Sequence, residues 1–282
     1  MERSPVWFVT GAASGFGREL VAEALKRGAR VAATARDPRR LAELGDDVLV
    51  LPLDVTLPNA VCKAVEAAEA RFGAIDVLVN NAGYGLIAAV EEASQDEIDA
   101  LIGTHFTGTL DLIRAVLPGM RARRRGHIVN FSSVAGFSGS AGTALYAAAK
   151  FAVEGLSEGL AREVAPLGIK VTIVEPGPFQ TSFFTTSRKM GATRIADYDG
   201  TSGAYRDRAS KTDPWLPGDP ARGAAAIADV VGMDAPPLRL LLGAFAVERA
   251  RAAYAARLAE VDRWEALSRS ADRPDAAGRP WP

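Results

Sequence analysis

The chain has 282 residues, of which 48% are hydrophobic and 24% charged, and its formal net charge at pH 7 is −1. This composition is typical of a soluble globular protein, and the near-neutral charge gives no electrostatic basis for binding nucleic acid or an anionic membrane. One cysteine and two histidines exclude an intrachain disulfide, a cysteine-based zinc site and a multi-histidine metal centre. No apolar run approaches the roughly 20 residues that span a bilayer, so we expect a cytoplasmic protein.

Short apolar runs alternate with longer helical patterns along most of the chain. The unbroken apolar runs are typical of strands buried on both faces. This alternation predicts an α/β fold with a doubly wound, mostly parallel, Rossmann-like sheet. We expect strands at 6–10, 30–35, 48–52, 76–80, 127–132, 169–174 and 238–242, and helices at 15–27, 38–44, 59–72, 95–117, 144–165, 220–231 and 247–267.

Residues 179–216 break this rhythm and carry scattered Thr, Ser, Gly and Pro. A long irregular insertion in a compact domain is typical of a lid over a site. Its aromatic residues either cover an apolar substrate or simply anchor the insertion, and the sequence does not decide between these two roles. We expect one domain over residues 1–282, with a loose tail at about 270–282. The aromatic residues of the insertion are Phe183, Phe184, Tyr198, Tyr205 and Trp215.

A glycine-rich segment, "TGAASGFG" at 10–17, joins the first predicted strand to the first helix. Gly11, Gly15 and Gly17 allow a tight turn and a close approach of the backbone to a pyrophosphate, which the helix N-terminus also attracts. The position between a strand and a helix favours a dinucleotide site. The spacing, G-x-x-x-G-x-G, differs from the general fingerprint.

The end of the second strand reads "ATAR", with Ala35 where a carboxylate would bind a ribose 2′-hydroxyl and Arg36 next to it. An arginine suits a 2′-phosphate, so the pattern favours NADP(H) over NAD(H). The alternative is a surface arginine in a loop that also holds Arg39 and Arg40.

Tyr146 and Lys150 are four residues apart on a predicted helix, and Ser133 follows the fifth strand. A phenol is a poor base at neutral pH, but a neighbouring ammonium lowers its pKa and a serine hydroxyl can orient a substrate oxygen. Tyr146 could then exchange a proton with a carbonyl or an alcohol. Asp54 and residues 80–83 lie at the same carboxyl edge of the sheet, where ligands bind in such folds.

From about Val6 to Leu242 the chain resembles the classical short-chain dehydrogenase/reductase family, through "TGAASGFG", "NNAG", Ser133, "YAAAK" and "PGPFQT" in order. The segments "ATARDP", "NNAGYG", "VEPGP" and "PPLRLLLG" are similar to its hydroxysteroid-dehydrogenase-like branch, which takes hydrophobic ketones and alcohols. The resemblance implies a homodimer or homotetramer and a catalytic role for Ser133, Tyr146 and Lys150. The cofactor contacts that it implies, besides Tyr146, Lys150 and Arg36, are Gly11, Ser14, Gly15, Phe16 and Gly17 at the pyrophosphate, Asp54 and Val55 at the adenine, Asn81, Ala82 and Gly83 at the adenosine ribose, and Pro176, Gly177, Phe179 and Thr181 towards the nicotinamide.

His105, in "THFTG", stands where the family carries an asparagine that holds a proton-relay water. Three interpretations remain open: a packed core imidazole, a ring that replaces the asparagine in the relay, and a chain that binds the dinucleotide without catalysis. The ordinary pKa of imidazole, near 6.5, makes the relay chemically feasible. His127, which opens a strand, is expected to be structural.

The sequence thus predicts an NADP(H)-dependent oxidoreductase that interconverts a hydrophobic ketone or aldehyde and an alcohol, with Tyr146 as general acid/base. The alternatives are a catalytically silent NADP(H)-binding protein and, ranked last, a dehydratase or epimerase. We expect no metal, no nucleic acid and no membrane partner. The apolar residues of the last helix, Tyr254, Leu258, Val261 and Leu267, are expected to pack on the body or on a partner.

Overall fold

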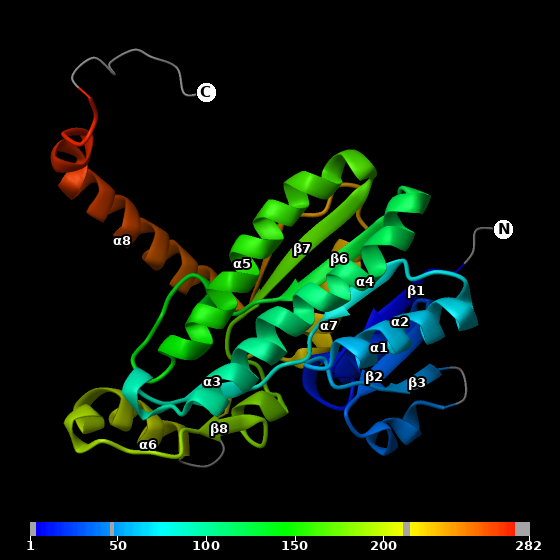
Figure 1. Ribbon diagram of the computed structural model, residues 1–282, viewed down its shortest axis with the longest axis horizontal. Helices are drawn as coiled ribbons and strands as arrows, with labels where there is room; N and C mark the ends of the chain where they lie inside the picture. The colour runs from blue at the N-terminus through cyan, green and yellow to red at the C-terminus, as the bar shows by residue number, and fades with distance from the viewer. Residues whose placement is uncertain (1–3, 46–47, 211–214, 274–282) are drawn as a thin grey trace.

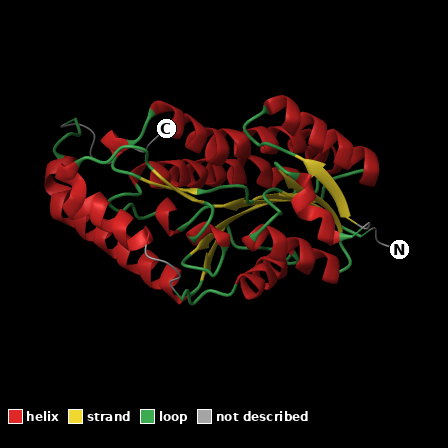
Figure 2. Ribbon diagram, turned by 90° about the horizontal axis from the view of Figure 1, so that it is seen from below, coloured by secondary structure: helices red, strands yellow, loops and turns green. Residues whose placement is uncertain are grey.

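The computed structural model describes residues 4–45, 48–210 and 215–273 of the chain. A seven-stranded sheet runs through the centre in the order β3-β2-β1-β4-β6-β7-β9, and every neighbouring pair is parallel. Helices cover both of its faces (Figure 2). The predicted doubly wound, Rossmann-like fold is confirmed. The strands are Val6–Val9 (β1), Arg30–Ala35 (β2), Val48–Pro52 (β3), Val77–Asn80 (β4), Gly126–Phe131 (β6), Ile169–Pro176 (β7) and Arg239–Leu242 (β9).

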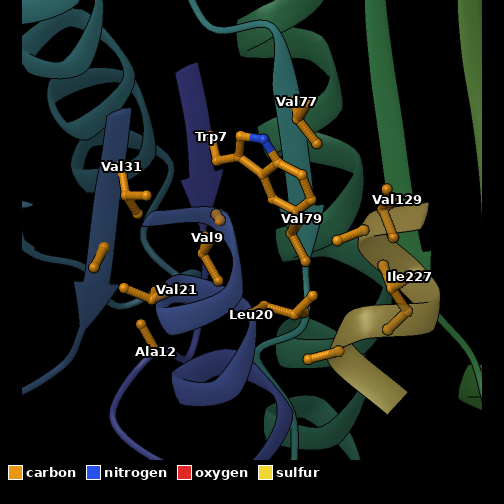
Figure 3. Close-up of a cluster of buried hydrophobic side chains, with 14 of the residues drawn as sticks. Trp7, Val9, Ala12, Leu20, Val21, Val31, Val77, Val79, Val129 and Ile227 are labelled. Carbon is orange, nitrogen blue, oxygen red and sulfur yellow. The ribbon is translucent and has the colours of Figure 1, made fainter. Parts of the chain in front are cut away.

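Two hydrophobic cores lie on opposite faces of the sheet. On one face, α1 and α7 pack together over β1 and its neighbours, where Trp7, Leu20 and Ile227 meet (Figure 3). On the other face, α2, α4 and α5 bury residues such as Val65, Leu112 and Leu160 against the sheet. Burying each large aliphatic side chain contributes about 1.5–3 kcal/mol. The helices are Gly15–Lys26 (α1), Pro58–Phe72 (α2), Gln95–Ile102 (α3), Gly108–Arg123 (α4), Ala144–Val164 (α5), Ala204–Ser210 (α6), Pro220–Val231 (α7) and Ala244–Arg269 (α8).

Capping residues and backbone conformation explain several of the helix boundaries. Helix α2 ends at Gly73, whose φ of 83° is left-handed and favours glycine. Helix α7 begins at Asp219, whose carboxylate accepts from the N–H groups of Ala221 and Arg222, with Pro220 in the first turn. Pro38–Leu44 is helical as predicted, although as a 3₁₀-helix.

The helix predicted at 95–117 differs in two ways from the observed one. Its α-helical pattern is interrupted by a π-helical segment, Gly103–Thr107, that contains His105. It also continues through Pro118 to Arg123 and ends where Arg124 adopts a left-handed φ of 51°. A proline inside a helix removes one hydrogen bond and crowds the carbonyl four residues before it, and here the buried side chains on both sides of Pro118 hold the helix together despite this cost.

The insertion after β7 contains more structure than the sequence predicts. Residues Arg188–Met190 (β8) pair in parallel with Gly85–Ile87 (β5) to form a second, two-stranded sheet. Helix α6 lies in the same insertion, at the lower left in Figure 1. Residues 211–214 of the predicted lid and most of the predicted tail, 274–282, lie outside the described residues. None of the described helices has the length and apolarity needed to cross a membrane.

Candidate functional site

The glycine-rich loop between β1 and α1 has the backbone that its sequence predicts. Gly11 and Gly15 have φ values of 66° and 53°, and a Cβ at Gly17 would lie 2.3 Å from the carbonyl oxygen of Gly11. Ser14 caps α1 without a side-chain bond to the first-turn N–H groups. A tight loop that leads into a helix N-terminus with open N–H groups fits a pyrophosphate.

Asn81 and Ala82 fasten this loop to the end of β4. The Nδ2 of Asn81 donates to the carbonyl oxygen of Thr10 at 2.8 Å, and both backbone N–H groups donate to the Thr10 hydroxyl at 3.0 Å. The resemblance implies that these residues contact a ribose. In the structure, the Asn81 side chain holds the loop, which is a structural role that the sequence does not reveal.

The other predicted cofactor contacts near the adenine end occupy the rim of the sheet. Ala35 is buried at the end of β2, whereas Arg36 is exposed. Its neighbour Arg39 pairs with Asp37 at 2.8 Å. Asp54 accepts from the N–H and the hydroxyl of Thr56, at 2.9 and 2.7 Å, in a turn after β3. Val55 is buried against Gly108, where a Cβ would lie 2.7 Å from the Val55 carbonyl oxygen.

Two of the predicted contacts use their side chains for packing instead. The ring of Phe16 lies 4.8 Å from that of Phe179 and 5.4 Å from that of Phe131, and Phe179 is buried. A ligand could therefore meet only the backbone of Phe179, whereas the ring of Phe16 is only partly buried. Pro176 ends β7, and the N–H of Gly177 donates to the Leu242 carbonyl oxygen at 3.0 Å.

The start of the insertion touches the glycine-rich loop directly. A Cβ at Gly15 would lie 3.2 Å from the Cβ of Thr181. The hydroxyls of Ser182 and Ser14 are 2.9 Å apart, within hydrogen-bond distance. The segment predicted to meet the nicotinamide end therefore lies against the loop predicted to hold the pyrophosphate.

Ser133, Tyr146 and Lys150 come together beyond the carboxyl end of β6. The Ser133 hydroxyl accepts from the N–H of Ala135 at 3.1 Å and hydrogen-bonds the Tyr146 phenol. Lys150 donates from Nζ to the Phe131 carbonyl oxygen at 2.8 Å, and its Nζ is 5.7 Å from the centre of the Tyr146 ring. The Phe131 carbonyl that orients Lys150 is thus two residues before Ser133 in the chain.

Burial controls the ionisation of this group. It raises the pKa of Tyr146 above its usual value near 10, and the hydrogen bond from Ser133 only partly opposes this effect. Burial also lowers the pKa of Lys150 to about 7, against the attraction of Glu154. The phenol is therefore protonated at neutral pH and can donate a proton to a carbonyl oxygen.

His105 is buried within the π-helical segment and faces this group. Its Nε2 lies 2.7 Å from the Tyr84 carbonyl oxygen and 3.2 Å from the Tyr84 nitrogen. The shorter contact identifies Nε2 as the protonated nitrogen, because a carbonyl can only accept. Its Nδ1 has no hydrogen-bond partner among the described residues, and its ring meets the Tyr146 ring edge-on at 5.4 Å.

Burial, with a smaller effect of Lys150, lowers the pKa of His105 well below 6.5. The ring therefore stays neutral near pH 7, and the titration suggested by its ordinary pKa does not occur there. His127 is buried in β6, where its Nε2 lies 2.9 Å from the Thr172 hydroxyl, and burial lowers its pKa to about 4. This environment fits the structural role predicted for His127.

An apolar cluster surrounds the Tyr146 phenol. Leu86 and Leu101 are buried beside Tyr146, and Phe183 of the insertion lies 5.7 Å from its ring. The other aromatic residues of the insertion differ in their positions. Phe184 packs on Phe183 at 5.4 Å, Tyr198 donates to Glu91 at 2.7 Å on the surface, Tyr205 adjoins Gly142, and Trp215 is 84% exposed.

A recess of about 140 Å³ opens beside this cluster. It is lined by Tyr84, Leu86, Asp96, Glu97, Ala100 and Lys189, and the Lys189 ammonium lies 4.6 Å from the centre of the Tyr84 ring. Tyr84 and Leu86 belong to both the recess and the apolar cluster. The recess therefore adjoins the apolar cluster that contains Tyr146.

Sequence reasoning missed a buried polar chain beneath the site. The Nδ2 of Asn80 donates to Oδ1 of Asn130 at 2.8 Å, and the Nδ2 of Asn130 donates to the Ser157 hydroxyl at 2.8 Å. These bonds tie the ends of β4 and β6 to α5. Asparagines in two apolar strands were the available signal, but pairing them requires the strand order.

Comparison with known proteins agrees with this geometry. The family model described as short chain dehydrogenase matches residues 5–192. The chain is 38% identical over 268 residues to the oxidoreductase BOA17 of Botryotinia fuckeliana, which covers 93% of this chain and 97% of that protein. It is also 38% identical over 241 residues to the 3-ketodihydrosphingosine reductase of Bacteroides thetaiotaomicron, with 83% and 86% covered.

Solved structures are similar over nearly the whole chain. A short-chain dehydrogenase from Streptomyces avermitilis superposes with a TM-score of 0.89 at 41% identity, covering 96% of this chain and 100% of that one. A short chain dehydrogenase from Burkholderia cenocepacia, solved in complex with NADP, superposes with a TM-score of 0.74 at 27% identity, covering 93% and 97%.

Proposed function

Because the chain belongs to the short-chain dehydrogenase family and is an NAD(P)-dependent oxidoreductase, we propose that it interconverts a hydrophobic ketone or aldehyde and the corresponding alcohol. The observation that carries this proposal is the buried group of Ser133, Tyr146 and Lys150 beside a loop that fits a pyrophosphate. A catalytically silent dinucleotide-binding protein is not favoured, since all three side chains of the predicted proton-transfer group are in place.

We propose NADP(H) as the nicotinamide cofactor. Ala35 leaves no carboxylate to bind a 2′-hydroxyl or to repel a 2′-phosphate, and the exposed Arg36 could bind that phosphate with paired N–H groups. The NADP complex of the Burkholderia cenocepacia relative supports the same choice. Thr10–Gly17 would hold the pyrophosphate, and Asp54 and Thr181 would lie towards the adenine and nicotinamide ends.

In the direction of reduction, a nicotinamide cofactor, when bound, would supply the hydride for the carbonyl carbon. The Ser133 hydroxyl orients the carbonyl oxygen, and the protonated Tyr146 donates its proton to that oxygen as an alcohol forms. Lys150, held by the Phe131 carbonyl, stabilises the phenolate that remains. The neutral His105, with Nδ1 as an open acceptor, would take the place of the family's asparagine beside Lys150.

The substrate is proposed to be apolar, as in the hydroxysteroid-dehydrogenase-like branch. Tyr146 sits in a cluster of Leu86, Leu101 and Phe183, which favours an apolar group next to the reacting carbonyl. The name of the 3-ketodihydrosphingosine reductase relative also points to a ketone on a long aliphatic chain. The insertion from about 179 to 216 would act as the lid.

We propose that the protein acts as a single-domain, cytoplasmic enzyme and as a homodimer or homotetramer. The exposed apolar residues of α8 support self-association, as argued below.

The test is NADPH consumption by the purified protein across a panel of bulky ketones and aldehydes, with Tyr146→Phe as the matched variant. We expect turnover of some apolar ketones and a loss of at least about 100-fold in kcat in the variant, because general acid catalysis contributes that much. NADPH binding should be retained in both proteins. Equal turnover by both proteins would refute the role of Tyr146, and tight NADPH binding without turnover on any carbonyl would favour the silent binder.

A further inference from the structure

Three glutamates and one arginine gather behind the catalytic lysine. Glu154 and Glu158 project from α5, Glu175 from the end of β7, and Arg239 from β9. Arg239 lies 3.3 Å from Glu154, 2.9 Å from Glu158 and 3.8 Å from Glu175, measured between nitrogen and carboxylate oxygen. The Arg239 guanidinium therefore lies within ion-pair distance of three carboxyl groups. None of these four side chains has a role in the proposed mechanism.

Two of these carboxyl groups are buried side by side. Glu154 is 8% exposed and Glu175 is 1% exposed, and an oxygen of each faces Nε of Arg239, at 3.3 and 3.8 Å. Two carboxylates buried next to each other repel, which favours protonation of one of them. Neither oxygen of Glu175 has a donor among the other described residues. The pair must therefore hold one proton between its two carboxyl groups.

The proton belongs to Glu175. Burial, with the neighbouring Glu154 as a second cause, raises the pKa of Glu175 to about 8. Burial raises the pKa of Glu154 as well, but Arg239 lies closer to Glu154, at 3.3 Å, than to Glu175, at 3.8 Å, and so favours the charge on Glu154. At neutral pH the pair therefore carries a single negative charge, located on Glu154.

This charge lies directly behind the catalytic group. Glu154 follows Lys150 by one helical turn on α5, so the two side chains are on the same helix face. Ser132 and Glu154 both lie against Gly136, and Ser132 stands between Phe131, the acceptor for Lys150, and Ser133 in the chain. Among the described residues, Glu154 is the only charge that acts against the effect of burial on the pKa of Lys150.

Other charged groups approach the pair from α8. The pKa of the Tyr254 phenol is raised by burial and by the charges of Glu175 and Glu154. Arg257 is directed away from the pair, since it donates to the Phe137 carbonyl oxygen and lies over the Phe151 ring at 5.4 Å. Arg239 and Glu158 complete the charged surroundings, and Glu158 is partly exposed.

We propose that Glu154 is a positioning residue for Lys150: its buried carboxylate favours the ammonium form of the catalytic lysine, and the proton on Glu175 keeps the charge of the pair at −1. The inference rests on the proposed function for its catalytic meaning. Without Glu154, burial alone would drive Lys150 to its neutral form, which cannot stabilise a phenolate.

The experiment is a ¹³C NMR titration of the lysine side chains in the full chain, without substrate or cofactor. The sequence contains only six lysines, and the Lys150 signal is assigned by its absence from Lys150→Met. We expect Glu154→Gln to lower the midpoint of Lys150 by about one pH unit, as the loss of a nearby opposite charge does. Glu175→Gln should leave the midpoint in place, because glutamine is neutral like the protonated acid.

Glu158→Gln is the matched control, since it removes a carboxylate from the same helix and from the same arginine, two turns from Lys150. It should not move the midpoint. An unchanged midpoint in Glu154→Gln, or equal shifts in the Glu154 and Glu175 variants, would overturn the proposal. The second outcome would show a general loosening of the site rather than the effect of one charge.

A second measurement covers the case in which Glu154→Gln does not fold. Carboxyl ¹³C titration of the unsubstituted protein should show one glutamate with a midpoint near pH 8, and this transition should be absent from Glu175→Gln. Ionisation of every glutamate below pH 6 would overturn the shared proton. Neither titration requires turnover, so failure of the proposed reaction and failure of this inference are separate results.

Discussion

Arg36 is the residue on which cofactor choice depends in the proposed function. It is exposed at the end of β2, and Arg39 nearby is engaged by Asp37. Removal of Arg36 should cost charge-assisted hydrogen bonds to a 2′-phosphate, each worth about 1.5–3 kcal/mol. Arg36→Ala is therefore expected to weaken NADPH binding by about 10–100-fold and to leave NADH binding nearly unchanged.

Titration calorimetry with both dinucleotides measures this difference, and Arg39→Ala is the control. Because Arg39 already pairs with Asp37, its removal should have a smaller effect on NADPH. An equal loss of affinity for NADPH and NADH in Arg36→Ala would contradict the role of Arg36 in binding the phosphate.

At the scale of elements, the π-helical segment Gly103–Thr107 sets the position of His105. The N–H of Gly108 bonds to the Gly103 carbonyl, five residues back, so the segment holds one residue more than a regular turn. The extra residue lets His105 face Tyr84 and Tyr146 while α4 still presents its apolar side to the sheet. Such bulges are frequent at functional sites.

The fit between this segment and the loop after β4 is tight. A Cβ at Gly83 would lie 2.5 Å from Cε1 of His105. Gly83→Ala should therefore lower the free energy of unfolding by about 1–3 kcal/mol through overpacking. The smaller side chain in Gly83→Ala/His105→Asn should restore part of this loss, measured by urea denaturation. Full additivity of the two single substitutions would mean that the contact does not limit packing.

The same elements show why sequence reasoning succeeds and fails. The limits of β2, β3 and α7 are predicted to the residue, because each is an apolar run bounded by glycine, proline or a capping aspartate. Strands β5 and β8 have three residues each and pair across about 100 residues of chain, so no local pattern reveals them. The π-helical segment is also invisible, because one extra residue leaves the apolar spacing almost unchanged.

The same distinction applies to the candidate site. The glycine-rich loop and the group of Ser133, Tyr146 and Lys150 can be recognised because their residue types and their spacing in the sequence indicate their chemistry. The contact between Glu154 and Glu175 joins a helix to a strand, and that between Phe183 and Tyr146 joins an insertion to a helix. The neutrality of His105 likewise follows from burial, which the sequence does not give.

At the scale of the whole molecule, most of helix α8 is exposed among the described residues. Ala246 and Ala250 are buried at its start, and Tyr254 packs on Phe137 at 5.8 Å, but the turns that follow are exposed. Figure 1 shows the helix leaving the body of the protein. Helices in proteins gain most of their stability from packing, so a surface that covered this face would stabilise the helix. The apolar residues that it exposes are Tyr254, Leu258, Val261, Trp264 and Leu267.

The charges on these turns favour a second copy of the chain as that surface. Between 255 and 269 the helix carries three arginines and three acidic residues, which do not suit an anionic membrane. In an antiparallel pair of α8 helices centred on Val261, Arg257 of one copy would lie opposite Glu265 of the other, and Leu258 opposite Trp264. The pattern is therefore complementary to itself.

Introducing charge at the centre of this face tests the assembly. Leu258→Glu with Val261→Glu should lower the molar mass by a factor of two, because two buried carboxylates on each copy would have no partner. Light scattering after gel filtration measures the mass, and unchanged NADPH binding shows that the fold is intact. Leu57→Glu, at an exposed leucine before α2, is the control and should keep the mass of the unsubstituted protein. If the double variant also keeps that mass, α8 is not an interface, and the copies associate through other faces or not at all.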